Sequence, residues 1–297
     1  MQYKLKINNE LLGILYMLLC QFSFATNDAF VKFVYQSYEE IFVLNQIIFI
    51  RGIFTLLFIL FFLYIKKELD FKKMFCSKEL RVRGFLESLA ALFFFIGIAL
   101  LPFAKVYILL SMAPILLTAF GAIFLNEKVR WRRWRAVLLG CVGVAVVINP
   151  GKLEFGYYFI FPILAAIMLS IRDLYTKNFK QDYHSLQIAF MTCFVVTIFF
   201  GLLSIYKFYD FSLKDILILF ISAFFLALGY IFSVATIKVA LVSVTSTFRY
   251  SVILWGIVYG YFLFEEIPVT NTYIGALIIV ISGLIIISRQ KKIGVIK

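Results

Sequence analysis

The residues of this chain best suited to chemistry are two acid–base pairs of identical spacing. Asp28 precedes Lys32, and Asp173 precedes Lys177, by four residues, and the two pairs lie 145 positions apart. Residues four apart share one face of a helix, so each carboxylate either neutralises its own lysine or binds a ligand beside it. Charges inside apolar segments are costly and usually functional, so the repeat indicates an internal duplication with a functional interior.

The composition predicts an integral membrane protein. The chain of 297 residues is 63% hydrophobic and 19% aromatic, with a mean hydropathy of +0.99, whereas soluble domains are roughly half apolar. Its four cysteines are scattered without a CxxC pair, so we expect neither a disulfide framework nor a metal site, and no cofactor. The net charge of +13 is divided among separate short loops, which argues against a nucleic-acid partner.

The apolar segments that must position these charges number ten, each close to the length that spans a bilayer. The predicted fold is therefore all-α, with ten transmembrane helices near Leu11–Val34, Ile41–Ile65, Val82–Leu101, Ala104–Leu125, Trp134–Ile148, Phe155–Tyr175, Leu186–Tyr206, Ile216–Ile237, Leu241–Phe264 and Tyr273–Ser288. Lys4 and Lys6 before the first segment also fit a secretory signal. Removal of that segment would unbalance two halves that otherwise match, which favours a retained helix.

The distribution of lysine and arginine predicts the orientation. With ten helices, 21 of these residues fall in loops on the side of the N-terminus, and only Lys105, Lys152, Lys207 and Lys214 fall on the other side. Cytoplasmic loops are enriched in positive charge. We therefore expect a multi-pass protein of the bacterial inner membrane, in contact with lipid, with both termini cytoplasmic.

The duplication divides the chain into residues 1–149 and residues 150–297, with five helices each. The ends of the fourth and ninth segments match at an offset of 139, and Gly143 matches Gly283 at 140. Because five is odd, the second repeat enters the membrane from the opposite side. Inverted repeats are typical of secondary carriers, which bind substrate near the midplane and alternate its access to the two faces.

Further charged residues lie within or beside the apolar segments. Arg51 and Arg249 lie too deep to reach the interface easily, so each either lines a cavity or pairs with an acid of another helix. Glu87 lies about a turn and a half into the third segment, where it either stabilises the helix N-terminus or couples to a proton. Glu127 and Glu266 end helices, and we expect them to pair with nearby bases or loop amides.

The end of the first repeat contains the residues Pro114, Phe124-Leu125-Asn126-Glu127, Trp131, Arg133-Trp134, Gly140 and Gly143. At these residues the sequence resembles the drug/metabolite transporter superfamily, in its EamA-type branch, and the similarity covers nearly the whole chain. The positions Asn27-Asp28, Lys32, Arg51, Asp173, Lys177 and Arg249-Tyr250 are similar to those of S-adenosylmethionine uptake carriers within this branch. Phe248, where those carriers have tyrosine, and the additional charge of Arg172 depart from the pattern. The resemblance implies a carrier built from ten helices.

The combined site hypothesis has two parts. The substrate-binding candidates are Asn27, Asp28, Arg51, Asp173, Arg249 and Tyr250, and the gating or coupling candidates are Lys32, Glu87 and Lys177. Acids and bases are nearly balanced, which favours a zwitterionic organic solute: an arginine would hold its carboxylate and an aspartate its amine or sulfonium. S-adenosylmethionine carries these groups, and an exchanged solute or a proton would drive its movement.

Other functions stay open on the same framework. Carriers or exporters of amino acids, riboflavin or drugs share the architecture, so fold alone does not choose the substrate. An ion channel would need a ring of carbonyls or charges that forms a filter. An enzyme is not expected, because His184 is the single histidine and lies in a loop, and neither HExxH nor GxSxG occurs. The sequence does not define the oligomeric state.

Overall fold

A computed structural model describes the chain except for residues 1, 39, 125–130, 149–156, 240–245 and 294–297. The regular elements of the described residues are all helices, as predicted. In chain order they are α1 (Gln2–Gln36), α2 (Val43–Lys66), α3 (Phe71–Cys76), α4 (Lys78–Leu100), α5 (Phe103–Leu110), α6 (Ala113–Phe124), α7 (Trp131–Ile148), η1 (Tyr157–Phe159), α8 (Ile160–Lys177), α9 (Ser185–Ser204), α10 (Leu213–Val239), η2 (Ser246–Tyr250), α12 (Ser251–Phe264) and α13 (Thr270–Ile293).

The helices are apolar enough to place the chain in a membrane. Among the described residues, seven helical segments are long and hydropathic enough to cross it, and three shorter apolar helices cover Trp134–Ile148, Phe248–Phe264 and Thr270–Ile285. These three correspond to the fifth, ninth and tenth predicted segments. Helices suit this setting because each satisfies its own backbone hydrogen bonds without water. The predicted all-α membrane protein is thus confirmed.

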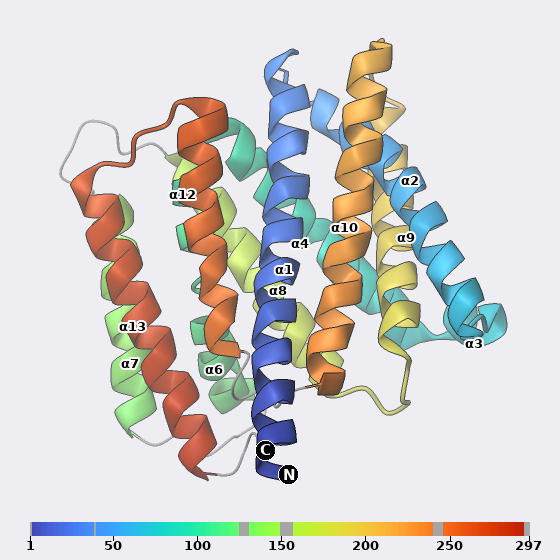
Figure 1. The fold of residues 1–297 in the computed structure, drawn as a ribbon. Helices are drawn as coiled ribbons and strands as arrows, with labels where there is room; N and C mark the ends of the chain where they lie inside the picture. The colour runs from blue at the N-terminus through green and yellow to red at the C-terminus, as the bar shows by residue number, and fades with distance from the viewer. Residues whose placement is uncertain (1, 39, 125–130, 149–156, 240–245, 294–297) are drawn as a thin grey trace.

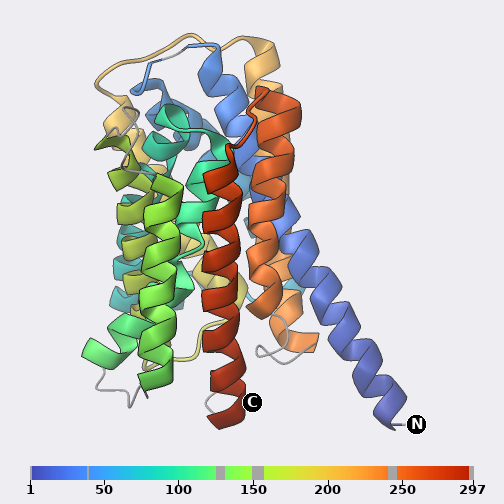
Figure 2. The same cartoon turned by 90° about the vertical axis from the view of Figure 1, so that its left-hand side faces the viewer.

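The helices form one bundle in which segments distant in sequence lie side by side. In Figure 1, α7 and α13 pack together at one edge and α2 and α9 at the other, while α1 packs on α10, and α4 on α8. Figures 1 and 2 both show that α1 begins and α13 ends at the same end of the bundle. We call this the terminal end, and the other the opposite end.

Local sequence explains where several helices begin and end. Asp70 caps α3 by accepting from the Lys73 amide at 2.9 Å, and Ser77 caps α4. His184, expected to be a solvated loop residue, caps α9: its Nδ1 accepts from the Leu186 amide at 3.3 Å. Such caps satisfy amides that lack a partner within the helix.

The fourth predicted segment is broken, which corrects the single helix expected over 104–125. α5 ends at Leu110 and α6 begins at Ala113. Pro114 has no N–H to donate to the carbonyl of Leu110, so the regular ladder stops there.

Glycine permits the close contact of α7 with α13. A Cβ atom added at Gly275 would lie 2.7 Å from the carbonyl oxygen of Gly143, and one at Gly143 would lie 3.1 Å from that of Gly275. Small residues let membrane helices approach in this way. Gly143 and Gly275 therefore allow the two backbones to pack in direct contact.

Candidate functional site

A cavity of about 510 Å³ lies inside the bundle and draws its walls from both halves of the chain. It runs from Asp28 and Tyr107 toward Thr176 and Ser185, near the α8–α9 connection at the terminal end. The ionisable acids and bases in its wall are Asp28, Arg51, Arg83, Glu87, Arg172, Asp173 and Arg249. Pockets that bind small molecules commonly have this size, with apolar walls and a few convergent polar groups.

Asp28 is the centre of the first polar cluster. Its carboxylate accepts hydrogen bonds from the Tyr107 hydroxyl at 2.6 Å and the Asn27 amide at 2.7 Å, and lies 4.0 Å from Arg51 Nη1. Arg51 also donates to Asn27 Oδ1 at 3.2 Å. Ser222 of α10 fixes Asn27 further by donating to its side chain at 2.9 Å. Three predicted binding residues therefore meet, and Arg51 both lines the cavity and pairs with an acid.

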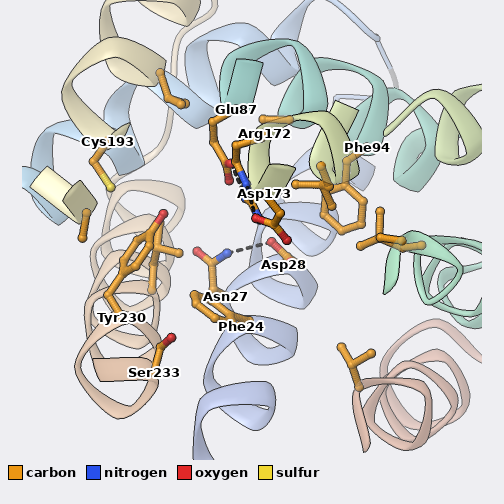
Figure 3. A pocket seen from close by; sticks show the side chains of 18 of the residues that line it. Phe24, Asn27, Asp28, Glu87, Phe94, Arg172, Asp173, Cys193, Tyr230 and Ser233 are labelled. Carbon is orange, nitrogen blue, oxygen red and sulfur yellow. Dashed lines mark hydrogen bonds and ion pairs between the residues drawn. The ribbon is translucent and has the colours of Figure 1, made fainter. Parts of the chain in front are cut away.

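Arg172 is the centre of the second cluster, shown in Figure 3. Its guanidinium contacts Glu87 of α4 and, at 2.6 Å, Asp173 of its own helix. The expectation that Glu87 stabilises a helix N-terminus is wrong, because α4 begins at Lys78 and places Glu87 in its third turn, beyond the free amides. The extra charge of Arg172, noted in the sequence as a departure, is the residue that joins the two acids.

Arg249 and Tyr250 also line the cavity, though not as expected from sequence. Arg249 lies in the short 3₁₀ helix η2, just before α12, and its side chain is exposed. It is therefore not deep within a long helix, as its sequence position suggested. Tyr250 is buried, and a Cβ atom at Gly283 would overlap its hydroxyl, so Gly283 makes room for the tyrosine ring.

Lys32 lies toward the opposite end, outside the cavity wall, in a buried ion pair. Lys32 does not pair with Asp28 of its own helix: its Nζ contacts Glu266 Oε1 at 2.5 Å and donates to the Leu101 carbonyl at 3.2 Å. Glu266 also accepts from the Phe103 amide at 2.5 Å, and Lys32 lies 4.7 Å from the ring centre of Phe264. The expectation that Glu266 pairs with a base and a loop amide is confirmed.

The second acid–base pair, Asp173 and Lys177, differs from the first in the position of its lysine. Asp173 lines the cavity, whereas Lys177 is the last residue of α8, exposed and one position beyond Thr176 of the cavity wall. Glu127, the counterpart of Glu266 in the first half, lies outside the described residues. The predicted boundary at residues 149 and 150 lies outside them as well.

Sequence reasoning missed two residues of the site. Tyr107, which donates to Asp28, carries no signal in an apolar run rich in aromatics. Arg83 is one of the 21 lysines and arginines assigned above to loops on the side of the N-terminus, but it lies inside α4 and lines the cavity. Its spacing of four from Glu87 could have revealed it, because residues so spaced share one helix face.

A bundle of membrane helices around a cavity with charges of both signs, closed at one end by a buried ion pair, defines a transport protein. The chain belongs to the EamA-like transporter family, whose model matches residues 11–149 and 155–289. Both the family resemblance and the expectation that the chain is not an enzyme are confirmed.

Relatives with assigned transport functions cover nearly the whole chain. An S-adenosylmethionine uptake transporter of Rickettsia conorii is 24% identical over 288 residues, 96% of each chain. A pseudopaline exporter of Pseudomonas aeruginosa is 25% identical over 287 residues, 94% of this chain and 97% of its own. A crystal structure with 14% identity has a TM-score of 0.61 over 97% of this chain and 99% of its own, which shows a shared fold.

Proposed function

We propose that this chain is a secondary transporter that moves a small zwitterionic solute, with S-adenosylmethionine as the leading candidate, across the bacterial inner membrane by alternating access. The observation that carries the proposal is the internal cavity of about 510 Å³, lined by carboxylates and guanidinium groups from both halves. Uptake and export relatives match at nearly the same identity, so the direction of transport is not part of the proposal.

The contacts between helices support two inverted repeats of five membrane helices, residues 1–149 and 150–297. The repeat pairs α1 with α8, α2 with α9, α4 with α10, α5–α6 with α12, and α7 with α13. If each helix is replaced by its partner in the other repeat, the α1–α10 contact becomes the α8–α4 contact, and the α4–α9 contact becomes the α10–α2 contact. All four contacts occur in the structure. The contacts α2–α9, α5–α12 and α7–α13 map onto themselves. This exchange is expected of a pseudo-twofold axis.

Charged and aromatic groups in the cavity support the choice of substrate. S-adenosylmethionine has a carboxylate, an ammonium, a sulfonium and an adenine ring. Guanidinium groups bind carboxylates bidentately, and Asp28 and Asp173 offer negative charge to the cationic groups. Phe24, Phe94 and Tyr230 lie on the cavity wall, where an adenine ring could stack.

The closed opposite end supports a state that is open toward the cytoplasm. In the orientation predicted by the positive charges, the terminal end is cytoplasmic. The cavity extends toward that end, while Lys32 and Glu266 form a buried ion pair at the other. Lys32 would then act as one gate, and Lys177 as its counterpart on the second repeat.

Counterflow tests the transport proposal. Proteoliposomes loaded with unlabelled S-adenosylmethionine are expected to accumulate the labelled compound from outside, saturably, and comparison of matched and acidic interiors reports proton coupling. Amino acids, nucleosides and riboflavin serve as parallel substrates. Accumulation of another solute in place of S-adenosylmethionine would reject the substrate, and ohmic conductance in planar bilayers would instead indicate a channel.

Neutralising Lys32 is expected to lower counterflow at least about tenfold. Removing one partner of a buried ion pair leaves the other charge uncompensated and costs about 3–5 kcal/mol, so Lys32→Met should destabilise the state closed at the opposite end. Lys177→Met is expected to impair the other half of the cycle. Initial rates of labelled counterflow measure both variants.

The matched control is Lys207→Met. Lys207 pairs with Glu40 at 2.6 Å, but both side chains are about half exposed, and such pairs contribute little. Its rate should stay within about twofold of wild type, on the scale of an exposed pair. Wild-type rates in both Lys32→Met and Lys177→Met would refute the gating roles.

A further inference from the structure

The cavity wall holds an excess of positive charge. Four guanidinium groups, those of Arg51, Arg83, Arg172 and Arg249, face three carboxylates, those of Asp28, Glu87 and Asp173. Each carboxylate lies within 4.0 Å of Arg51 or Arg172. Among the ion pairs of the described residues, Arg83 and Arg249 have no acidic partner. In the described part of the wall, guanidinium groups therefore outnumber carboxylates by one, and an anionic group of the solute would balance this excess locally.

Arg83 is held in place by two hydroxyl groups rather than by an ion pair with any acid of the described residues. Its Nε donates to the Thr176 hydroxyl at 3.0 Å, and its Nη1 donates to the hydroxyl of Thr192. Each hydroxyl donates its own proton to the carbonyl four residues earlier, Thr176 to Arg172 and Thr192 to Ile188, both at 2.7 Å. Both hydroxyl oxygens therefore accept hydrogen bonds from Arg83. Because Thr176 belongs to α8 and Thr192 to α9, these two helices fix the orientation of the guanidinium.

We propose that Arg83 forms a carboxylate-binding subsite for the transported solute, a role that rests on the transport function proposed above. A guanidinium carries five N–H donors, and the hydrogen bonds from Arg83 to protein use Nε and Nη1, which leaves Nη2 for a ligand. Arg249 adds a second positive charge on the same cavity wall. The planar fork of arginine matches a carboxylate bidentately, which a lysine would not do.

The subsite also sets the orientation of the bound solute within the cavity. Arg83 lies in the second turn of α4, beside Thr176 near the end of α8, which places it toward the terminal end. Asp28 and Tyr107 form the other end of the cavity. The carboxylate of the solute therefore points to the terminal end and its cationic group to Asp28. The match is local to this end of the cavity: the positive charge there suits the single carboxylate of S-adenosylmethionine better than a doubly charged phosphate ester, while the ammonium and sulfonium of the solute lie toward Asp28.

Competition experiments on Arg83 variants test the subsite. Labelled S-adenosylmethionine counterflow is inhibited either by the unlabelled compound or by its decarboxylated analogue, and the ratio of inhibition constants reports the contribution of the carboxylate. Hydrogen bonds to a charged partner are strong enough to make this preference about 10- to 100-fold in the wild type. We expect Arg83→Gln to abolish the preference and Arg83→Lys to retain part of it.

The control variant is Arg81→Gln, on the same helix but exposed and outside the cavity wall. Its preference should equal that of the wild type, and size-exclusion chromatography verifies that every variant is folded. An active Arg83→Gln variant with an unchanged preference overturns the subsite and leaves the transport proposal standing. If the wild type carries a different solute, that solute is compared with its amide or ester.

Two further outcomes would also overturn the subsite. One is a carried solute without a carboxylate, and the other is stronger competition by adenosine monophosphate, a phosphate ester, than by S-adenosylmethionine. Absence of counterflow for every solute in the wild type would reject the transport proposal itself, together with the subsite.

Discussion

Replacing Arg172 by glutamine is expected to lower the free energy of unfolding by about 1.5–3 kcal/mol, the scale of hydrogen bonds to charged groups, because its ion pairs with Glu87 and Asp173 are only partly buried. Arg172 contacts Glu87 and Asp173 at the same time and connects α8 to α4. Without it, Glu87 and Asp173 lose the guanidinium group that bridges them and connects α4 with α8. Titration of the purified protein with SDS in mixed micelles measures the change.

The loss of stability in Arg172→Gln should arise from its contacts with Glu87 and Asp173, and replacing an arginine without such contacts should not cause it. Arg135→Gln removes an exposed arginine of α7 and should alter stability by less than about 0.5 kcal/mol, as is usual for surface substitutions. Combining Arg172→Gln with Glu87→Gln and Asp173→Asn removes the uncompensated charges and should recover much of the lost stability. Wild-type stability in Arg172→Gln alone would contradict the structural role of the cluster.

Replacing Asp28 by asparagine is expected to lower transport by about 100-fold or more while the protein still inserts into the membrane. The substitution keeps the shape but leaves Arg51 without its acidic partner, an uncompensated charge whose cost, about 3–5 kcal/mol, corresponds to at least this factor. It also removes the negative charge proposed to face the cationic group of the solute. Initial rates of counterflow, normalised to reconstituted protein, measure the loss.

Two variants separate this role from general effects. Tyr107→Phe removes only the hydroxyl that donates to Asp28 at 2.6 Å, and should cost about tenfold, the scale of one hydrogen bond to a charged group. Asp210→Asn changes an exposed acid between α9 and α10 and should leave the rate unchanged. Equal rates for Asp28→Asn and wild type would remove Asp28 from the binding site.

Hydropathy alone predicted the helices reliably, because a segment that spans a membrane must itself consist mostly of apolar residues. It failed where the backbone departs from a continuous α-helix. Pro114 explains the break between α5 and α6 and was visible in the sequence. The 3₁₀ helix that carries Arg249 had no comparable signal, so the residue appeared to lie deep within a helix.

The candidate site was predicted better as a set of residues than as a set of contacts. Asn27, Asp28, Arg51, Asp173, Arg249 and Tyr250 all line the cavity. Their partners could not be read from sequence spacing: Lys32 pairs with Glu266, 234 positions away, and not with Asp28, four positions away. Arg83 escaped notice because it is the second residue of the predicted segment Val82–Leu101 and was counted with the loop charges, whereas α4 begins at Lys78 and places it in the second turn.

The sequence by itself determined that this is an all-helical membrane protein whose two halves repeat a pattern of charges, because composition and spacing are local properties of the chain. Only the tertiary structure decided which charges neutralise one another and which remain for a ligand. An ion pair between helices depends on distances of a few ångströms set by the packing of the whole bundle. For that reason, the repeated acid–base pairs revealed the duplication, but only the bundle shows that Lys32 pairs with Glu266 and that Arg83 lines the cavity without an ion pair to any acid of the described residues.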